Sequence, residues 1–246
     1  MSLPRLRLEN CSLDAESNLW HISPAEAHHL VKVRRLYTGS LVEGLLSDET
    51  EGGALGRKIL LKLECHGEDV FAREVESEEV GGEAELVLLL ALLKTDQWED
   101  SLRFAAQTGV TRIIPLIAER SVPKISPDEL GKKMSRWRKI LDEATKQSSA
   151  IVPPRLAEPV KFCDFDFDSL TGQRLAAILS KGTVSLKNLD LGQSVAIAIG
   201  PEGDWSPTEA QRLLQEGFTP ITLGKRILKA STAVAVACGA ISILRE

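Results

Sequence analysis

Aromatic side chains are scarce in this chain of 246 residues, since Phe, Trp and Tyr make up 4% of it and tyrosine occurs once. A nucleic-acid surface built from such a composition would depend on cations more than on base stacking. Cysteine is also rare, and no two cysteines have the C-x-x-C spacing. We therefore expect reduced thiols in a cytoplasmic protein, without a disulfide framework.

The sequence has no long apolar run and no metal-ligand spacing. Its longest apolar run, residues 86–93, has the length of a strand, and the first ten residues have no apolar signal core. Of the four histidines, His28 and His29 are adjacent, which is the wrong spacing for two ligands on one helix face. We expect neither a membrane segment nor a metal ion.

An excess of positive charge is missing as well. The formal net charge is −5. Residues 1–82 contain 9 Lys and Arg against 15 Asp and Glu, and residues 83–246 contain 21 against 20. Binding to nucleic acid by bulk charge is therefore excluded, and any RNA contact must come from local patches.

The sequence pattern changes at residues 80–83, where a Glu-rich stretch meets a glycine pair and then an aliphatic run. Residues 1–80 contain short alternating runs separated by glycines, which is typical of a small β-barrel-like domain. Residues 83–246 alternate apolar strands with helical segments. This alternation predicts an α/β domain whose mostly parallel sheet carries helices on both faces.

Three helices are predicted to begin at a Ser-Pro-x-Glu capping box, in which Ser and Glu exchange hydrogen bonds with the backbone. The capping serines are Ser23, Ser126 and Ser206. In the second domain we predict strands at residues 85–93, 111–117, 174–180, 194–199 and 219–223. The predicted helices cover residues 98–107, 126–148, 206–217 and 231–244.

A glycine loop follows the predicted strand 194–199 and comprises Gly200, Pro201, Glu202, Gly203 and Asp204. Open parallel sheets bind ligands beyond the carboxyl ends of their strands. Gly200 and Gly203 allow the backbone to approach a ligand closely or to adopt a positive φ. Taken alone, the loop is equally consistent with a simple strand-to-helix turn, and it has no phosphate-loop motif.

A cationic loop follows the next strand, which ends before Gly224, and contains Lys225, Arg226 and Lys229. The helix predicted at 231–244 is small and apolar nearly all round, which is typical of a helix packed on several sides. Two loops of this kind after two strands indicate a ligand site.

Five motifs in order resemble those of the 16S ribosomal RNA uracil-N3 methyltransferases, a family of the knotted (SPOUT) methyltransferase superfamily. The first is HHLVKVRRL at 28–36. The second combines QTGVT at 107–111, IPL at 114–116 and ERS at 119–121. The others are RW at 136–137 with QS at 147–148, GPEG at 200–203, and LGKRIL at 223–228.

The resemblance implies a PUA-like RNA-binding barrel at 1–80 and a methyltransferase domain with a trefoil knot at 83–246. It also implies a homodimer, S-adenosyl-L-methionine as cofactor, and 16S rRNA of the small ribosomal subunit as partner. The residues implied to hold the cofactor are Leu179, Ser180, Ile199, Gly200, Pro201, Glu202, Gly203, Leu223, Gly224, Arg226, Ile227 and Leu228.

Two residues are candidates for catalysis. N3 of uracil must lose its proton before it is a good nucleophile, and the planar guanidinium of Arg226 suits the resulting negative charge. Glu202 is either a general base or the cap of a backbone turn. The residues expected to contact RNA are Lys32, Arg34, Arg35, Arg120 and Lys229. The cations at residues 124–139 form either a second patch or a solvated helix face.

The chain departs from the family pattern at three places. Asp204 stands where a second glycine is usual. Lys229 and Ser231 stand where Arg and Glu are usual, and Ser231 is expected to act as a helix N-cap. Ser149 and Ala150 follow the QS motif where Arg is frequent. Two alternatives therefore stay open: a knotted methyltransferase for another RNA position, and an RNA-binding protein with little methyl transfer.

Overall fold

The computed structural model describes residues 3–9, 11–14, 17–48, 55–67, 69–80, 84–148, 150, 152–179 and 182–245. The chain forms two compact units, Met1–Glu83 and Ala84–Glu246. Residues 81–83 of the predicted boundary and Ser149 lie outside the described residues. Each unit has its own hydrophobic core.

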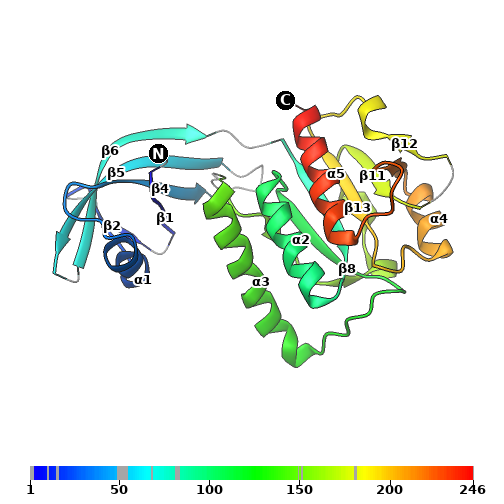
Figure 1. Cartoon of the computed structure of the whole chain (residues 1–246), viewed down its shortest axis with the longest axis horizontal. Helices are drawn as coiled ribbons and strands as arrows, with labels where there is room; N and C mark the ends of the chain where they lie inside the picture. Colours follow the sequence, from blue (N-terminus) through cyan, green and yellow to red (C-terminus); the bar gives the residue numbers. More distant parts are fainter. Residues whose placement is uncertain are drawn as a thin grey trace. The chain divides into compact units, whose positions relative to one another are not determined.

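The first unit is built on one sheet with strand order β1-β4-β5-β6-β3-β2 (Figure 1). Its strands are β1 (Arg5–Arg7), β2 (Ser12–Asp14), β3 (Leu19–His21), β4 (Leu41–Asp48), β5 (Leu55–His66) and β6 (Asp69–Val80). Only β1 and β4 pair in parallel. Within the described residues, the edge strands β1 and β2 do not pair with each other, so these pairings do not close a barrel.

A short helix, α1 (Pro24–His28), continues directly into a π-helical segment, His29–Val33. Ser23 is the N-cap of α1, but its side chain makes no capping bond, so the capping box predicted there is wrong. The backbone amide of Ser23 instead points at Cys11 Sγ, 3.5 Å away. Strands β2 and β3 and the π-helical segment were not predicted from the sequence.

The second unit is an α/β fold whose sheet has the order β10-β8-β7-β13-β11-β14-β12, with β9 beside β8, and its strands pair in parallel throughout the described residues. The strands are β7 (Leu86–Ala91), β8 (Arg112–Ile117), β9 (Arg155–Leu156), β10 (Val160–Lys161), β11 (Gln173–Ala177), β12 (Val184–Ser185), β13 (Val195–Ile199) and β14 (Thr219–Thr222). The helices are α2 (Thr95–Gln107), α3 (Pro127–Ser148), α4 (Pro207–Gln215) and α5 (Ala230–Leu244).

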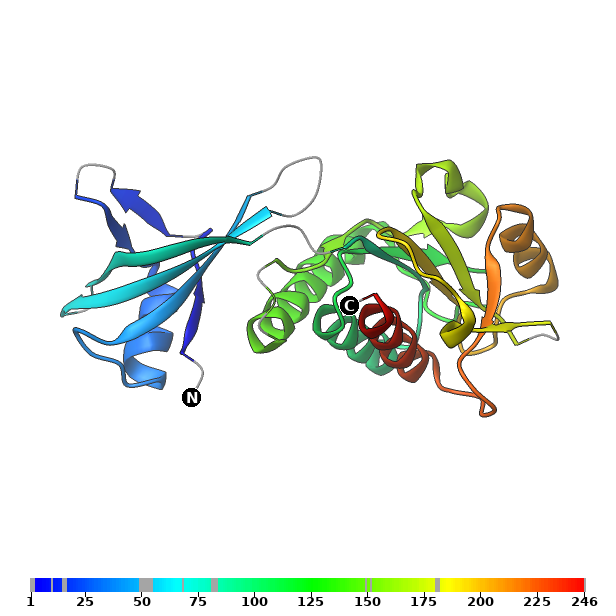
Figure 2. The same cartoon turned by 90° about the horizontal axis from the view of Figure 1, so that it is seen from above.

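Side-chain alternation places β7 and β13 between two apolar layers. In β13, Val195, Ile197 and Ile199 face the core under α2, α3 and α5, whereas Ala196 and Ala198 face the layer that contains α4. Figure 2 shows α5 on one side of the sheet and α4 on the other. The predicted parallel sheet with helices on both faces is thus confirmed, and it places the carboxyl ends of β11, β13 and β14 together.

Of the other two predicted capping boxes, one is complete and the other is half formed. Ser206 begins α4 with a complete capping box, since Glu209 N donates to Ser206 Oγ at 3.3 Å and Ser206 N donates to Glu209 Oε2 at 3.0 Å. At Ser126, the Glu129 carboxylate accepts from the serine amide and hydroxyl, which is one half of a box. The N-cap of α5 is Lys229, so the expectation that Ser231 caps this helix is wrong.

Helix α5 is buried on one face only. Ala233, Val234, Ala237 and Ile241 are buried, whereas Ile243 on the opposite face is 71% exposed. The packing expected on several sides is observed against α2 and β13, whereas the opposite face of the helix is exposed. Within the described residues, no helix is long and apolar enough to cross a membrane, and no group of three His, Cys, Asp or Glu is placed to hold a metal ion.

Candidate functional site

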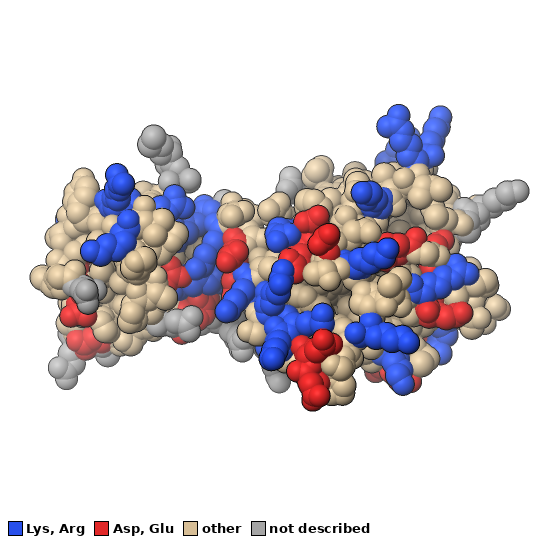
Figure 3. Space-filling model, turned by 60° about the horizontal axis from the view of Figure 1, so that its bottom comes forward, with Lys and Arg blue, Asp and Glu red and all other residues tan. Residues whose placement is uncertain are grey.

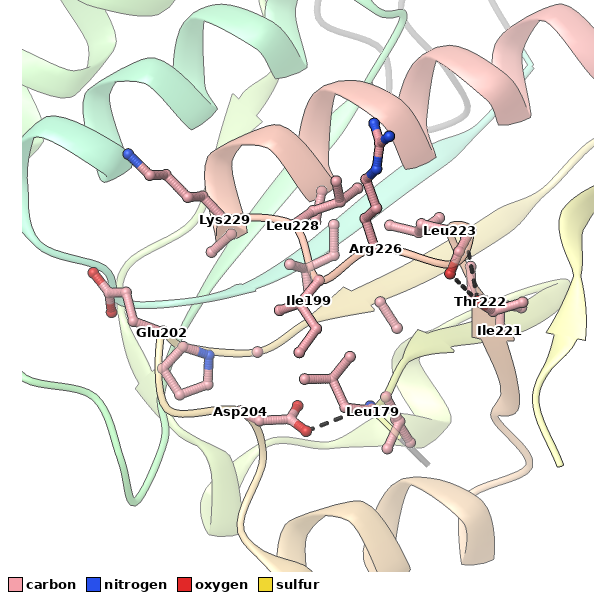
Figure 4. Close-up of a pocket in the computed structure, with 18 of the residues that line it drawn as sticks. Leu179, Ile199, Glu202, Asp204, Ile221, Thr222, Leu223, Arg226, Leu228 and Lys229 are labelled. Carbon is pink, nitrogen blue, oxygen red and sulfur yellow. Dashed lines mark hydrogen bonds between the residues drawn. The ribbon is translucent and has the colours of Figure 1, made fainter. Parts of the chain in front are cut away.

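A cavity of about 400 Å³ opens at the carboxyl ends of β11, β13 and β14. This volume lies in the range of small-molecule sites. Three loops surround the cavity, one after each strand, and the first turns of α2 and α5 complete it (Figure 4). Its lining residues are Gln97, Ala177, Ile178, Leu179, Ile199, Gly200, Pro201, Glu202, Asp204, Ile221, Thr222, Leu223, Gly224, Arg226, Ile227, Leu228, Lys229, Ala230 and Ala233.

The cavity contains most of the residues that the sequence proposed for a cofactor, from three separate segments of the chain. Two are exceptions: Gly203 is not among the lining residues, and Ser180 lies outside the described residues. Lys229, expected at the RNA surface, also lines the cavity. Gln97 and Asp204 were not singled out as site residues, because their roles depend on contacts with distant segments.

Gly200 is required by close packing with a tryptophan. Neither Gly200 nor Gly203 has a positive φ; the positive φ in this loop, 59°, belongs to Asp204. A Cβ on Gly200 would lie 3.2 Å from the indole of Trp205. Trp205 is 3% exposed and its ring centroid lies 5.4 Å from that of Phe162, so it has little room to move. Glycine at position 200 therefore avoids a steric clash with Trp205 in the cavity wall.

Glu202 ties the glycine loop to the start of α2. Its Oε1 accepts a hydrogen bond from the backbone amide of Lys94 at 3.0 Å and from Gln97 Nε2 at 3.1 Å. Lys94 is the N-cap of α2, so the carboxylate also lies near the positive end of this helix. Figure 4 shows the carboxylate turned toward the start of α2. These contacts favour the second of the two predicted roles, a cap of the backbone.

Arg120 also holds the glycine loop, through hydrogen bonds to its backbone. Its Nη1 donates to the carbonyl oxygens of Gly203 at 2.9 Å and Trp205 at 3.4 Å. The residue was expected at the RNA surface, and it is exposed, but its guanidinium is engaged with the protein backbone. Arg120 thus stabilises the loop that forms the cavity wall.

The loop between β14 and α5 begins with a turn that needs glycine. Gly224 has a φ of 120°, a conformation that other residues rarely adopt. The hydroxyl of Thr222 accepts from Gly224 N at 3.2 Å and donates to Gly224 O at 3.0 Å. This turn directs the chain over the cavity, so that Arg226 and Lys229 come to line it.

Arg226 and Lys229 bring two positive charges to the rim of the cavity. Both residues are exposed. In the described part of the chain, neither side chain has a hydrogen bond or an ion pair. Exposed cations without an ion-pair partner attract anionic groups of a ligand. The rim is therefore suited to a negatively charged ligand.

The first unit carries the other cations expected to bind RNA. Lys32, Arg34 and Arg35 are exposed at the end of the π-helical segment. Arg35 has a φ of 56°, and Tyr37, the single tyrosine, is 73% exposed. On the face in Figure 3, lysines and arginines of the second unit are interspersed with acidic residues. On this face, the cations therefore do not form one continuous basic surface.

Comparison with known proteins gives consistent matches. The family model described as an RNA methyltransferase domain matches residues 82–242. The ribosomal RNA small subunit methyltransferase E of Synechocystis is 32% identical over 232 residues, which cover 92% of this chain and 73% of that protein.

Solved structures agree with these sequence matches. A methyltransferase from Legionella pneumophila in complex with SAM superposes with a TM-score of 0.83 at 25% identity, covering 99% of this chain and 98% of that one. The ribosomal RNA small subunit methyltransferase E from Neisseria gonorrhoeae, bound to S-adenosyl methionine, has a TM-score of 0.82 at 23% identity, with 98% of both chains covered. This second likeness shows the shared fold.

Proposed function

The chain belongs to the family of RNA methyltransferases that includes the ribosomal RNA small subunit methyltransferases E, and from this premise we propose that it transfers a methyl group from S-adenosyl-L-methionine to N3 of a uridine in 16S rRNA. The observation that carries the proposal is the pair of unpaired cations, Arg226 and Lys229, at the rim of a cavity formed by three loops. Such a rim suits a nucleobase that becomes an anion during the reaction.

The cavity fits S-adenosyl-L-methionine in size and in chemistry. Ile199, Ile221 and Leu228 give it apolar walls for an adenine ring, and the three loops supply backbone donors and acceptors. Gln97 Oε1 is buried and has no hydrogen-bond partner within the described residues. A buried acceptor of this kind is costly unless a donor such as a hydroxyl or amino group of a ligand reaches it.

The cofactor supplies a methyl group activated by its positively charged sulfur. In the reaction, N3 of uracil gives up its proton to water, a bond forms between N3 and the methyl carbon, and the carbon–sulfur bond breaks with its electron pair left on sulfur. We assign to Arg226 the stabilisation of the negative charge that deprotonation leaves on N3 and the two carbonyl oxygens. The wall of the site is held in position beforehand by the bonds of Glu202, by those of Arg120 and by the bond from Leu179 N to the Asp204 carboxylate.

Variants of Glu202 separate its two predicted roles. Because Glu202 accepts bonds from Lys94 and Gln97, we expect E202Q, which keeps an acceptor oxygen, to retain methyl transfer within about threefold. E202A loses both bonds, and we expect its Kd for S-adenosyl-L-methionine to rise about tenfold. Single-turnover rates and calorimetric Kd values measure these effects. A large loss of rate in E202Q with unchanged binding would instead identify Glu202 as the general base.

Three further features belong to this proposal. A trefoil knot in Ala84–Glu246 is supported by β14, which lies between the earlier strands β11 and β12. A PUA-like role of Met1–Glu83 in binding RNA is supported by exposed Lys32, Arg34 and Arg35. A 16S rRNA substrate within the small ribosomal subunit would place the reaction in the cytoplasm.

We also propose a homodimer that covers the exposed face of α5. Val236, Ile243 and Leu244 are 40%, 71% and 47% exposed on this face, and a groove of about 420 Å³ runs beside them. The groove shares Leu223 and Gly224 with the cofactor cavity. A second copy would therefore support the loop that forms the cavity. We expect a solution mass of twice the chain's 26.9 kDa in light scattering; a monomer mass would contradict the dimer.

A further inference from the structure

Asp204 has a left-handed backbone conformation, which is uncommon for residues other than glycine. Its φ is 59°, and it is one of three non-glycine residues with a positive φ in the described part of the chain, with Asn18 and Arg35. Glycine would adopt this conformation without the steric penalty of a Cβ. A side chain that persists at such a position points to a function for the side chain itself.

The Asp204 carboxylate contacts two backbone amides. Its Oδ1 accepts from Trp205 N at 2.9 Å, and its Oδ2 accepts from Leu179 N at 3.4 Å. The second contact joins the loop after β13 to the loop after β11 (Figure 4). Both donors are neutral, and none of the ion pairs within the described residues involves Asp204. The negative charge is held in place, and no cation among the described residues pairs with it.

The surroundings of Asp204 screen its negative charge only weakly inside the cavity. Asp204 is half-buried and lines the cavity beside apolar Ile178 and Leu179. Glu202, the other acidic lining residue, is turned to α2. Figure 4 shows the Arg226 and Lys229 side chains extending away from Asp204. A carboxylate against an apolar wall acts on nearby charges more strongly than one in bulk water.

We propose that Asp204 is a specificity-determining residue, which makes the cavity prefer the positively charged sulfonium form of the cofactor over its neutral thioether product. The proposal rests on the proposed function, because it requires that the chain binds S-adenosyl-L-methionine. The two ligands differ by the methyl group and one positive charge, so a fixed negative charge attracts one more than the other. The same preference would help the product, S-adenosylhomocysteine, to leave after each turnover.

Two variants separate the charge of Asp204 from its shape. Asparagine tolerates a positive φ and keeps one acceptor oxygen, so D204N removes the charge and retains one of the two bonds to backbone amides. Glycine fits the backbone and removes both the charge and the tie to Leu179. The matched control is D190N, which removes an exposed aspartate that does not line the cavity. Thermal unfolding of each variant verifies that it is folded.

The test is the ratio of the Kd for S-adenosylhomocysteine to the Kd for S-adenosyl-L-methionine, measured by calorimetry on the full chain. For D204N we expect this ratio to fall roughly fivefold to tenfold, through weaker binding of S-adenosyl-L-methionine alone. D204G should show the same fall and, in addition, weaker binding of both ligands. D190N should match the unmodified chain.

Three results would overturn the inference in distinguishable ways. Unchanged Kd values for both ligands in D204N show that the charge does not discriminate between them. An equal weakening of both ligands in D204N shows that Asp204 acts only as a structural tie. If the unmodified chain binds neither ligand, the proposed function itself fails, and the inference fails with it.

Discussion

Replacing Arg226 with alanine is expected to lower the single-turnover rate of methyl transfer by about 100-fold or more, because the variant loses the group that we propose to stabilise charge on the deprotonated uracil. Arg226 lines the cavity and has no partner among the described residues, so its removal leaves no buried group unpaired. We therefore expect the Kd for S-adenosyl-L-methionine to change by no more than about threefold. R226K should give an intermediate rate, since lysine keeps the charge and loses the planar fork.

Lys225 supplies the matched control for this experiment. It is also exposed and cationic, and it adjoins Arg226, but it is not among the lining residues. K225A should keep the rate within about threefold, the effect of one peripheral phosphate contact. A near-normal rate in R226A would contradict its assigned role. Equal losses in R226A and K225A would show that the loop acts through general attraction to RNA.

Replacing Gly200 with valine is expected to lower the free energy of unfolding by about 2–3 kcal/mol, because the new side chain overlaps the indole of Trp205. Even a single Cβ at this position lies 3.2 Å from the ring, and Trp205 is held by Phe162. The new side chain should also displace the cavity wall, and binding sites are sensitive to small displacements of their residues. We therefore expect the Kd for S-adenosyl-L-methionine to rise tenfold or more. Chemical denaturation and calorimetry measure the two effects.

Gly203, in the same loop, provides the comparison. A Cβ there would lie 3.5 Å from the Arg120 side chain, an ordinary van der Waals distance, and Gly203 does not line the cavity. G203A should therefore change stability by less than about 0.5 kcal/mol and leave binding unaltered. If G200V and G203A behaved alike, the packing explanation for Gly200 would be wrong.

Sequence patterns predicted strand burial and helix capping where these depend on residues close together in the sequence. The alternation of Val and Ile with Ala in β13 follows from burial between two different layers. The Ser206 box forms because its partners are three residues apart. At Ser23 the same pattern failed, since α1 is only five residues long and continues into a π-helical segment.

The architecture of the site was less predictable, because distant residues create it. Glu202 contacts Lys94 and Gln97 across more than one hundred positions, and Arg120 reaches Gly203 across 83. Asp204 differed visibly from the family pattern, but its positive φ and its bond to Leu179 depend on the folded loops. The loops predicted from the sequence line one cavity, whereas the contacts that hold them in place required the structure.

The central claim is that this chain methylates N3 of a uridine in 16S rRNA. The most direct test incubates the purified chain with S-adenosyl-L-methionine and small ribosomal subunits from a strain that lacks the gene, followed by nuclease digestion and mass spectrometry of the rRNA. The account predicts 3-methyluridine at a single position, absent before incubation and strongly reduced with R226A. Methylation of a different base or atom, or no methylation of either the subunits or free 16S rRNA, would contradict it.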